Sequence, residues 1–179
     1  HISITINDKE KKKVENVRSL LSGQEIPGCT YKYYSSDADN MLDFVSREIN
    51  SFKGTERNLV FIDPYGYSNI TKDKLYSLLK NEATEIILFL PINQMYRFTE
   101  AALTDFERSC YDNLRRFITT FFPLGHKIHS DGIKGTLDFI HEVKSALTFG
   151  NKFLSCSHYI ERGKGNYYAL FFITSNIYG

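Results

Sequence analysis

The stretch that decides the fold is a short apolar run closed by an acid, a proline, an aromatic residue and a glycine: Asn58-Leu59-Val60-Phe61-Ile62-Asp63-Pro64-Tyr65-Gly66. The apolar run predicts a fully buried strand of a parallel sheet, because neither face of such a strand needs a polar residue. Pro64 then ends the strand, since proline cannot donate to a ladder. Open α/β sheets bind their ligands beyond the carboxyl ends of the strands. Asp63 and Tyr65 are therefore the first candidates for a functional site.

The rest of the chain has the composition of an ordinary globular domain. It contains 179 residues, of which 42% are hydrophobic and 24% are charged. This length suffices for one full core, so we expect a single α/β domain over residues 1–179. The net charge of +1 gives no overall field that favours nucleic acid or an anionic membrane, so either kind of binding needs a local patch.

The cysteine content and the hydropathy of the chain indicate its cellular compartment. The three cysteines (Cys29, Cys110 and Cys156) are odd in number and form no C-x-x-C pair. This pattern argues against both a disulfide framework and a zinc site. No apolar run reaches the roughly 18 residues of a membrane helix, and no signal peptide opens the chain. We therefore expect a cytoplasmic protein with no membrane partner.

Strand and helix patterns alternate along most of the chain. Strands are expected near residues 2–6, 29–34, 58–62 and 85–90, with helices between them. This alternation predicts a parallel, doubly wound sheet with right-handed crossovers. Apolar residues then recur every three or four positions from residue 97 to 122, which predicts a long amphipathic helix that is either continuous or broken. Residues 153–160 and 167–174 predict an antiparallel hairpin.

A parallel sheet finished by an antiparallel hairpin, with an acid after its first strand and Asp-Pro-Tyr after a middle strand, resembles the Rossmann-like S-adenosylmethionine-dependent methyltransferases. Within that superfamily the chain resembles the three-Cys-motif partner protein family. Three segments carry the resemblance: residues 60–66 (VFIDPYG), residues 87–91 (ILFLP) followed by Arg97, and residues 167–172 (YYALFF). It implies a methyltransferase-like α/β domain with S-adenosylmethionine as cofactor. The cysteines of the family's name belong to a radical-type partner protein.

The resemblance also shows what the sequence lacks. Such methyltransferases hold the methionine end of the cofactor at a glycine-rich turn after their first strand, where glycine lets backbone amides approach the ligand. No such turn is present, and the strand at residues 2–6 corresponds to the family's second strand. We therefore expect the first strand to lie upstream of His1, which makes the chain an N-terminally truncated portion of the domain.

The resemblance assigns cofactor binding to Asp8, Asp37 and Ala38. Asp8 resembles the acid that bonds the ribose hydroxyls, because a carboxylate accepts from two vicinal hydroxyls at once. The family more often has Glu one position earlier, where this chain has Asn7. Asp37 resembles the acid that reads the adenine amino group, with the backbone amide of Ala38 beside it. Both acids also suit the caps of the helices that follow them, and this alternative stays open.

Asp63, Pro64 and Tyr65 resemble the Asp-Pro-Pro-Tyr motif of methyltransferases that modify the exocyclic amines of bases. There the acid and a proline carbonyl accept from the amino group, and the ring stacks on the extruded base. This chain lacks the second proline, so its ring comes one position earlier. The resemblance makes these three the catalytic residues and Arg97 a substrate-binding residue for a phosphate or carboxylate. In the alternative, Asp63 caps a loop, Tyr65 packs on the next helix and Arg97 is an exposed helix residue.

The sequence thus favours a methyltransferase-like domain that acts on nucleic acid or a nucleotide-linked substrate and requires no metal. Its expected partners are nucleic acid, a radical-type three-Cys-motif partner protein and a second copy in a homodimer. A non-catalytic interaction module that works with a partner protein is the alternative, and a receiver-like domain phosphorylated on Asp63 is a weaker one. His126 and His129 share a loop with Asp131, but this spacing has no defined ligand geometry, so no metal site is expected.

Overall fold

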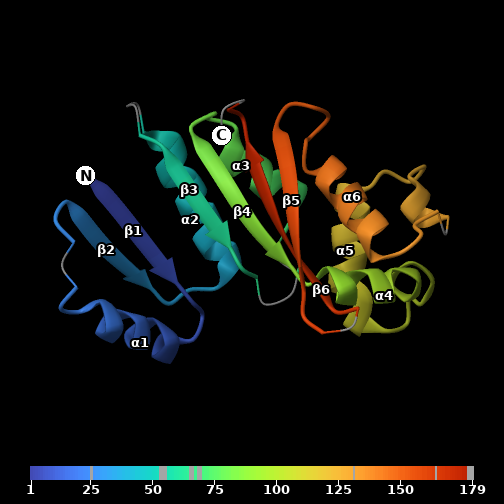
Figure 1. The fold of residues 1–179 in the computed structure, drawn as a ribbon, viewed down its shortest axis with the longest axis horizontal. Helices are drawn as coiled ribbons and strands as arrows, with labels where there is room; N and C mark the ends of the chain where they lie inside the picture. Colours follow the sequence, from blue (N-terminus) through green and yellow to red (C-terminus); the bar gives the residue numbers. More distant parts are fainter. Residues whose placement is uncertain are drawn as a thin grey trace. The chain divides into compact units, whose positions relative to one another are not determined.

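The computed structural model describes residues 1–24, 26–52, 56–64, 67, 70–130, 132–163 and 165–176. Its Cα atoms group into two compact units, His1–Glu48 and Ile49–Gly179, and each unit is described by itself. The expectation of one domain over the whole chain stays a prediction. Figure 1 traces the elements of both units.

The first unit is a βαβ arrangement. Strands β1 (Ile2–Asn7) and β2 (Cys29–Tyr34) pair in parallel, with Ile2 opposite Cys29 and Asn7 opposite Tyr34. Helix α1 (Lys11–Leu21) connects them, and helix α2 (Ala38–Ser51) begins after β2 and crosses into the second unit. The β-branched residues at alternate positions of β1 suit a strand with one covered face. These two strands and the helix between them confirm the sequence prediction.

Helix α1 covers this small sheet with few residues. Val14 is its buried residue, and the guanidinium of Arg18 lies 4.9 Å from the ring centroid of Tyr33 on β2. Leu20 belongs to the apolar spacing of the helix but is 72% exposed.

The second unit contains a four-stranded sheet and four helices. Its strands are β3 (Asn58–Ile62), β4 (Thr84–Leu90), β5 (Leu154–Glu161) and β6 (Tyr167–Thr174). Its own helices are α3 (Lys72–Leu79), α4 (Ile92–Thr104), α5 (Asp112–Phe121) and α6 (Thr136–Ala146), with single 3-10 turns η1 (Ser109–Tyr111) and η2 (Lys127–His129). Thr71 caps α3 as predicted, since its hydroxyl accepts the N–H of Lys74 at 3.4 Å.

The strand order in this sheet is β3-β4-β6-β5. Strands β3 and β4 are parallel, whereas β6 is antiparallel to both of its neighbours, so β5 runs in the same direction as β4. The predicted hairpin is therefore confirmed, and its second strand enters the sheet between β4 and β5 (Figure 1). The structure is mixed α/β, with one parallel sheet and one mixed sheet.

Helices pack against one face of this mixed sheet. Alternate residues of the two central strands are fully buried on that face: Ile86, Leu88 and Leu90 on β4, and Ala169, Phe171 and Ile173 on β6. The helices contribute Leu75, Leu78, Met95, Leu114, Phe117, Phe139 and Val143, each at most 1% exposed. The core of the second unit therefore lies between this face and the helices.

The opposite face of the same sheet, which we call the open face, stays accessible. On β3 it carries Leu59 and Phe61, which are 62% and 60% exposed. The prediction of a fully buried strand is therefore wrong for β3. The reason is that the helices cover only the other face of β3, on which Ile62 is 7% exposed. The open face continues across the sheet through the partly exposed side chains of Ile87, Phe89, Tyr168, Leu170 and Phe172.

The amphipathic stretch over residues 97–122 is broken into two helices, which is the second of the two predicted forms. Helix α4 starts earlier, at Ile92, and ends at Thr104, after which the backbone of Asp105 leaves helical geometry (φ −98°, ψ 87°). The guanidinium of Arg115 on α5 donates to the carbonyls of Ala102 at 2.8 Å and of Asp105 at 2.7 Å. A helix end leaves its last carbonyls without intrahelical partners, and Arg115 satisfies two carbonyls at this one. The break is thus held by a side chain from the next helix.

Among the helices of the described residues, none has both the length and the apolar character that crossing a membrane requires.

We expect Arg115→Ala to lower the free energy of unfolding by about 1–3 kcal/mol, because two half-buried carbonyls lose a charged donor. The variant also loses the contact of the guanidinium with the ring of Phe106, 4.8 Å from its centroid. Urea denaturation followed by circular dichroism measures the change. The control is Arg116→Ala, an exposed position one residue along the same helix, which should stay within about 0.5 kcal/mol of the unchanged chain. Equal effects of the two variants would contradict this role of Arg115.

Candidate functional site

Asp63 lies directly after β3, at its carboxyl end. Its side chain is exposed and Pro64 is partly buried, whereas Tyr65 lies outside the described residues. No hydrogen bond or ion pair links the Asp63 carboxylate to another described residue. Most of the loop that Asp63 would cap lies outside the described residues, so the catalytic role and the loop-capping alternative both stay predictions.

Arg97 lies in the second turn of α4, which follows β4 through Pro91. Because Ile62 pairs with Leu88, the carboxyl ends of β3 and β4 lie at the same edge of the sheet. The Arg97 side chain is exposed, and its guanidinium lies 5.9 Å from the centroid of the neighbouring Phe98 ring. This placement fits an exposed helix residue, and no contact joins Arg97 to Asp63 among the described residues. Substrate binding by Arg97 stays a prediction.

Tyr67 is a residue of the same loop that sequence reasoning did not single out. Its ring lies edge-on to Phe117 of α5, with centroids 6.4 Å apart. Burial, and secondarily the charge of the Cys110 thiolate, raises the pKa of the Tyr67 hydroxyl above its ordinary value. A neutral, packed phenol anchors the loop after Asp63 to the helical layer. The sequence feature that could have indicated this packing role is the second tyrosine of Tyr65-Gly66-Tyr67.

In the first unit, the cofactor candidates lie at one edge of the parallel pair. Since Asn7 pairs with Tyr34, the residues that follow β1 and β2 emerge side by side. The side-chain amide of Asn7 joins the two loops: it donates to the Ser36 carbonyl and accepts the Ser36 N–H, both at 3.0 Å. Asn7 is therefore a structural clamp at the position where the family more often has an acid.

Asp8 and Asp37 each have a local partner at this edge. The Asp8 carboxylate accepts the N–H of Glu10 at 2.7 Å, just before α1, and Lys13 Nζ lies 3.9 Å away. Asp37 forms an exposed ion pair of 2.9 Å with Lys9, and this bond raises the pKa of the lysine. The alternative that Asp8 is the N-cap of α1 is wrong, because the N-cap is Glu10 and Asp8 lies two residues before it. A carboxylate keeps further acceptor sites when it accepts one bond, so neither role excludes a ligand.

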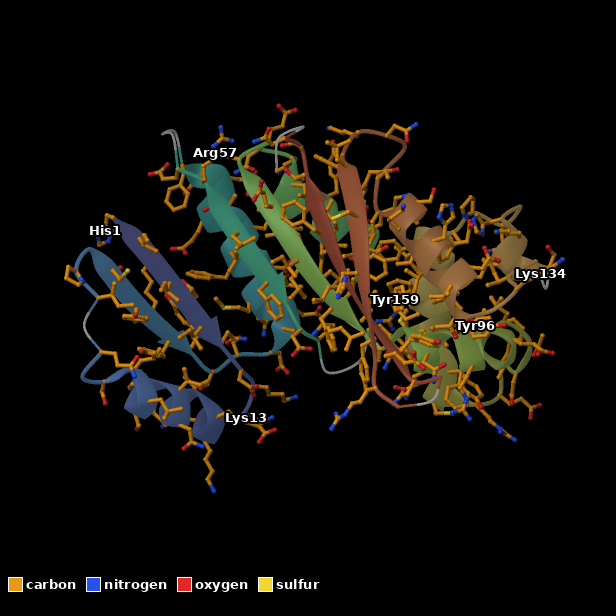
Figure 2. The ribbon with its side chains drawn as sticks, in the orientation of Figure 1. His1, Lys13, Arg57, Tyr96, Lys134 and Tyr159 are labelled. Carbon is orange, nitrogen blue, oxygen red and sulfur yellow. The ribbon has the colours of Figure 1, made fainter. Side chains whose placement is uncertain are left out.

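Two open hollows lie near these elements, one in each unit. The hollow beside Asp8 has a volume of about 430 Å³ and is lined by Ile6, Asn7, Asp8, Lys13, Val14, Asn16 and Val17. In Figure 2, Lys13 marks this corner of the first unit. The other hollow, of about 280 Å³, includes Arg57, Glu82, Glu85 and Thr174 and lies at the amino ends of β3 and β4. It is at the wrong end of these strands for the chemistry expected at Asp63.

The structure therefore groups the site residues within units. Asp8, Asp37 and Ala38 belong to the first unit and lie close to the carboxyl ends of β1 and β2. Asp63, Pro64 and Arg97 belong to the second unit and follow β3 and β4. A common site of the two groups stays a prediction.

Charged side chains of the loop that contains His126 and His129 bind two acids of α6. His126 Nδ1 accepts the N–H of Ile128 at 3.2 Å, so its Nε2 carries the proton and donates to Glu142 of α6 at 2.9 Å. Lys127 Nζ bridges Glu142 at 2.9 Å and Asp138 at 3.0 Å. Within the described residues no group of three or more His, Cys, Asp or Glu side chains could hold a metal ion. Asp131 lies outside those residues.

No protein-family model matches the chain, and no curated protein or solved structure matches it either. The likeness to the three-Cys-motif partner protein family therefore stays a hypothesis.

We expect the stabilising effect of Asp138 to depend on pH. A hydrogen bond from the backbone of Lys134, and then one from the Lys127 side chain, lowers the pKa of the Asp138 carboxyl. A depressed folded-state pKa contributes stability above the ordinary aspartate pKa, and this stability is lost as the pH falls through the folded value. Asp138→Asn should therefore be less stable than the unchanged chain at pH 7, and the difference should shrink below about pH 4.

Urea denaturation at several pH values between 7 and 3 measures this difference. Glu107→Gln, which neutralises an exposed carboxylate elsewhere in the second unit, is the matched control at pH 7. A difference that stays constant down to pH 3 would contradict the role given to the ionised carboxylate.

Proposed function

We propose that this chain is a methyltransferase-like domain that uses S-adenosylmethionine and places a nucleophile beside Asp63. The observation that carries the proposal is the strand arrangement of the second unit, in which parallel strands are finished by an antiparallel strand in the middle of the sheet. The three segments that carry the sequence resemblance lie on β3, β4 and β6, which are consecutive neighbours in this sheet. The neighbouring positions of these strands, which are far apart in the sequence, support the proposal.

The residues present fit one end of the cofactor. Asp8 and Asp37, which retain acceptor capacity at one edge of the β1–β2 pair, would hold the ribose hydroxyls and the adenine amino group, with the amide of Ala38 beside them. The open hollow of about 430 Å³ next to Asp8 is lined by Asp8 and Asn7 but not by Asp37 or Ala38, so it offers room beside one of the two acids. For the methionine end the sequence offers no glycine-rich turn, and we derive no step there.

When bound, S-adenosylmethionine supplies an electrophilic methyl group. The protein's part is to place the nucleophile. The exposed carboxylate of Asp63 would accept an N–H of the substrate amine and so orient its nitrogen as the nucleophile. Methyl transfer would release S-adenosylhomocysteine and a proton from the amine. Tyr65 covers the substrate ring, and Arg97 binds its phosphate or carboxylate. Positioning of this kind supplies most of the catalysis, because it replaces a bimolecular encounter by a held geometry.

The proposed substrate is nucleic acid or a nucleotide-linked molecule, since the likeness of Asp63-Pro64-Tyr65 is to enzymes that methylate base amines. With a net charge of +1, the chain offers no general field for nucleic acid, so recognition rests on the local site. The proposed protein partner of this chain is a radical-type three-Cys-motif partner protein.

A second candidate function is a non-catalytic interaction module with the same fold. The open face favours it, because Leu59 and Phe61 are adjacent on that face and both more than half exposed. Contiguous exposed apolar side chains on a soluble protein mark interaction sites.

Calorimetric titration of S-adenosylhomocysteine into residues 1–179, and into the full-length gene product, tests the first proposal against the second. We expect binding that Asp37→Ala weakens roughly tenfold or more, because the adenine amino group loses a charged acceptor. Glu107→Ala, a carboxylate removed from an exposed loop, should leave the affinity unchanged. No heat and no thermal shift in either protein would end the methyltransferase proposal and leave the interaction module.

A further inference from the structure

The link between α4 and α5, two helices that pack against each other (Figure 1), presents an exposed aromatic ring. Phe106 lies two residues after the end of α4 and is 70% exposed. The guanidinium of Arg115 lies over this ring, 4.8 Å from its centroid, and is itself fixed by its bonds to the carbonyls of Ala102 and Asp105. A ring that is covered on one face and still 70% exposed presents its other face to solvent. Phe106 is thus an exposed ring that is held in place from behind.

Two more rings lie near the same link. The ring of Phe98 on α4 and that of Tyr111 on η1 have centroids 5.9 Å apart, and their planes are inclined by 36°. Phe98 is 36% exposed, and Tyr111 is partly exposed. Tyr111 precedes Arg115 by four residues, a spacing that places two side chains on the same side of a helix. Since Arg115 covers Phe106, the three rings lie on one side of the helix pair, and we call Phe98, Phe106 and Tyr111 the aromatic surface.

Arginine side chains border the aromatic surface. The guanidinium of Arg97 lies 5.9 Å from the ring centroid of Phe98, and its side chain is exposed. Arg108, in the link itself, is also exposed and forms an ion pair of 3.1 Å with Asp105. An exposed guanidinium with one partner keeps further N–H donors. Arg97 and Arg108 are therefore accessible to an anionic group of a ligand.

The aromatic surface adjoins the loop that follows Asp63. The Cys110 thiol on η1 is close enough to the Tyr67 hydroxyl that its charge, after burial, helps to raise the pKa of that phenol. The Tyr67 ring also packs edge-on against Phe117 of α5, with centroids 6.4 Å apart. Tyr67 lies four residues after Asp63, so η1 and α5 contact the loop that carries the candidate catalytic residue. A substrate at Asp63 would have the aromatic surface beside it.

Exposed rings with cations beside them suit single-stranded nucleic acid. Unpaired bases stack on aromatic side chains, and basic side chains bind the phosphates between them. In a duplex the faces of the bases are already stacked on each other, so the rings could not reach them. An anionic membrane would need an excess of cations, but residues 97–116 contain four arginines and four acids. A peptide strand or amphipathic helix would need a sheet edge or an apolar groove, and this surface is neither.

We propose that a single strand of nucleic acid binds here, with its bases stacked on the rings of the aromatic surface and its phosphates bound by Arg97 and Arg108. This inference deepens the proposed function and rests on it for the base held at Asp63. One nucleotide has one base and one phosphate, whereas this surface has three rings and two accessible guanidinium groups. The substrate class is therefore a strand of several nucleotides and not a free nucleotide.

Fluorescence anisotropy of a labelled single-stranded oligonucleotide of about 12 nucleotides, titrated with residues 1–179, tests the inference. We expect Phe106→Ala to raise the dissociation constant roughly fivefold or more, because one base loses its stacking partner. Phe106→Tyr keeps the ring and should keep the affinity. Phe52→Ala removes a ring that is 50% exposed ahead of β3, the strand that Asp63 follows, and should have no effect.

The chain contains no tryptophan, so Phe106→Trp gives a direct signal of stacking. Unlabelled oligonucleotide should quench the fluorescence of this single indole, because a stacked base lies against it. Phe52→Trp is the matched control and should keep its fluorescence. Absence of quenching in Phe106→Trp, or equal quenching in both variants, overturns the inference.

Salt dependence tests the two arginines. Each phosphate contact to a single strand adds about 0.7 to the slope of log affinity against log salt concentration. Arg97→Gln and Arg108→Gln should therefore each reduce this slope by about 0.7. Lys80→Gln, which removes an exposed cation at the end of α3, should leave it unchanged. A slope that neither arginine variant changes contradicts the phosphate contacts.

The remaining outcomes separate this inference from the proposed function. Duplex DNA or a free mononucleotide that binds as tightly as the single strand overturns the inference. A chain that binds S-adenosylhomocysteine but no oligonucleotide at low salt overturns it alone and leaves the aromatic surface to a protein partner. Oligonucleotide binding that depends on Phe106, with no binding of S-adenosylhomocysteine, supports the aromatic surface and ends the methyltransferase proposal. Circular dichroism verifies the fold of every variant.

Discussion

The rest of the second unit depends on the packing of β4 and β6 against the helices. These strands supply six side chains with 0% exposure, Ile86, Leu88, Leu90, Ala169, Phe171 and Ile173, and all six lie on one face. Burying each of the isoleucine, leucine and phenylalanine side chains contributes about 1.5–3 kcal/mol, and hydrophobic burial of this kind is the main favourable term in folding. The insertion of β6 between β4 and β5 makes this core possible, because it places the apolar strand β6 directly beside the apolar strand β4.

A core built on one face leaves the other face and one edge to be covered. The helices that follow β3 and β4 have their buried residues on the β4–β6 core, and β3 lies at the edge of the sheet with its two largest side chains exposed. The same strand carries Asp63 at its carboxyl end. One strand therefore carries both the exposed apolar side chains of the open face and the candidate residue at its carboxyl end.

Polar side chains hold the places where the backbone leaves regular structure. Asn7 joins the loops after β1 and β2 through two bonds to Ser36. Arg115 binds the carbonyl end of α4, and Lys127 bridges two acids of α6. Each contact joins residues that are separated in sequence, so periodicity could not reveal them. These contacts fix the loops and helix ends that connect the regular elements.

The sequence by itself determined the kinds of elements and their order. Apolar runs and helical spacings correctly predicted β1 to β4 and the closing hairpin, because local periodicity follows directly from which face of an element is buried. It also indicated Asp63 as the residue at a strand end. Only the tertiary structure decided that β3 is an edge strand, that β6 enters between β4 and β5, and that α4 stops at Thr104. Neighbours in a sheet and partners for helix-end carbonyls are long-range contacts, and a sequence pattern records that a face is apolar without recording what covers it.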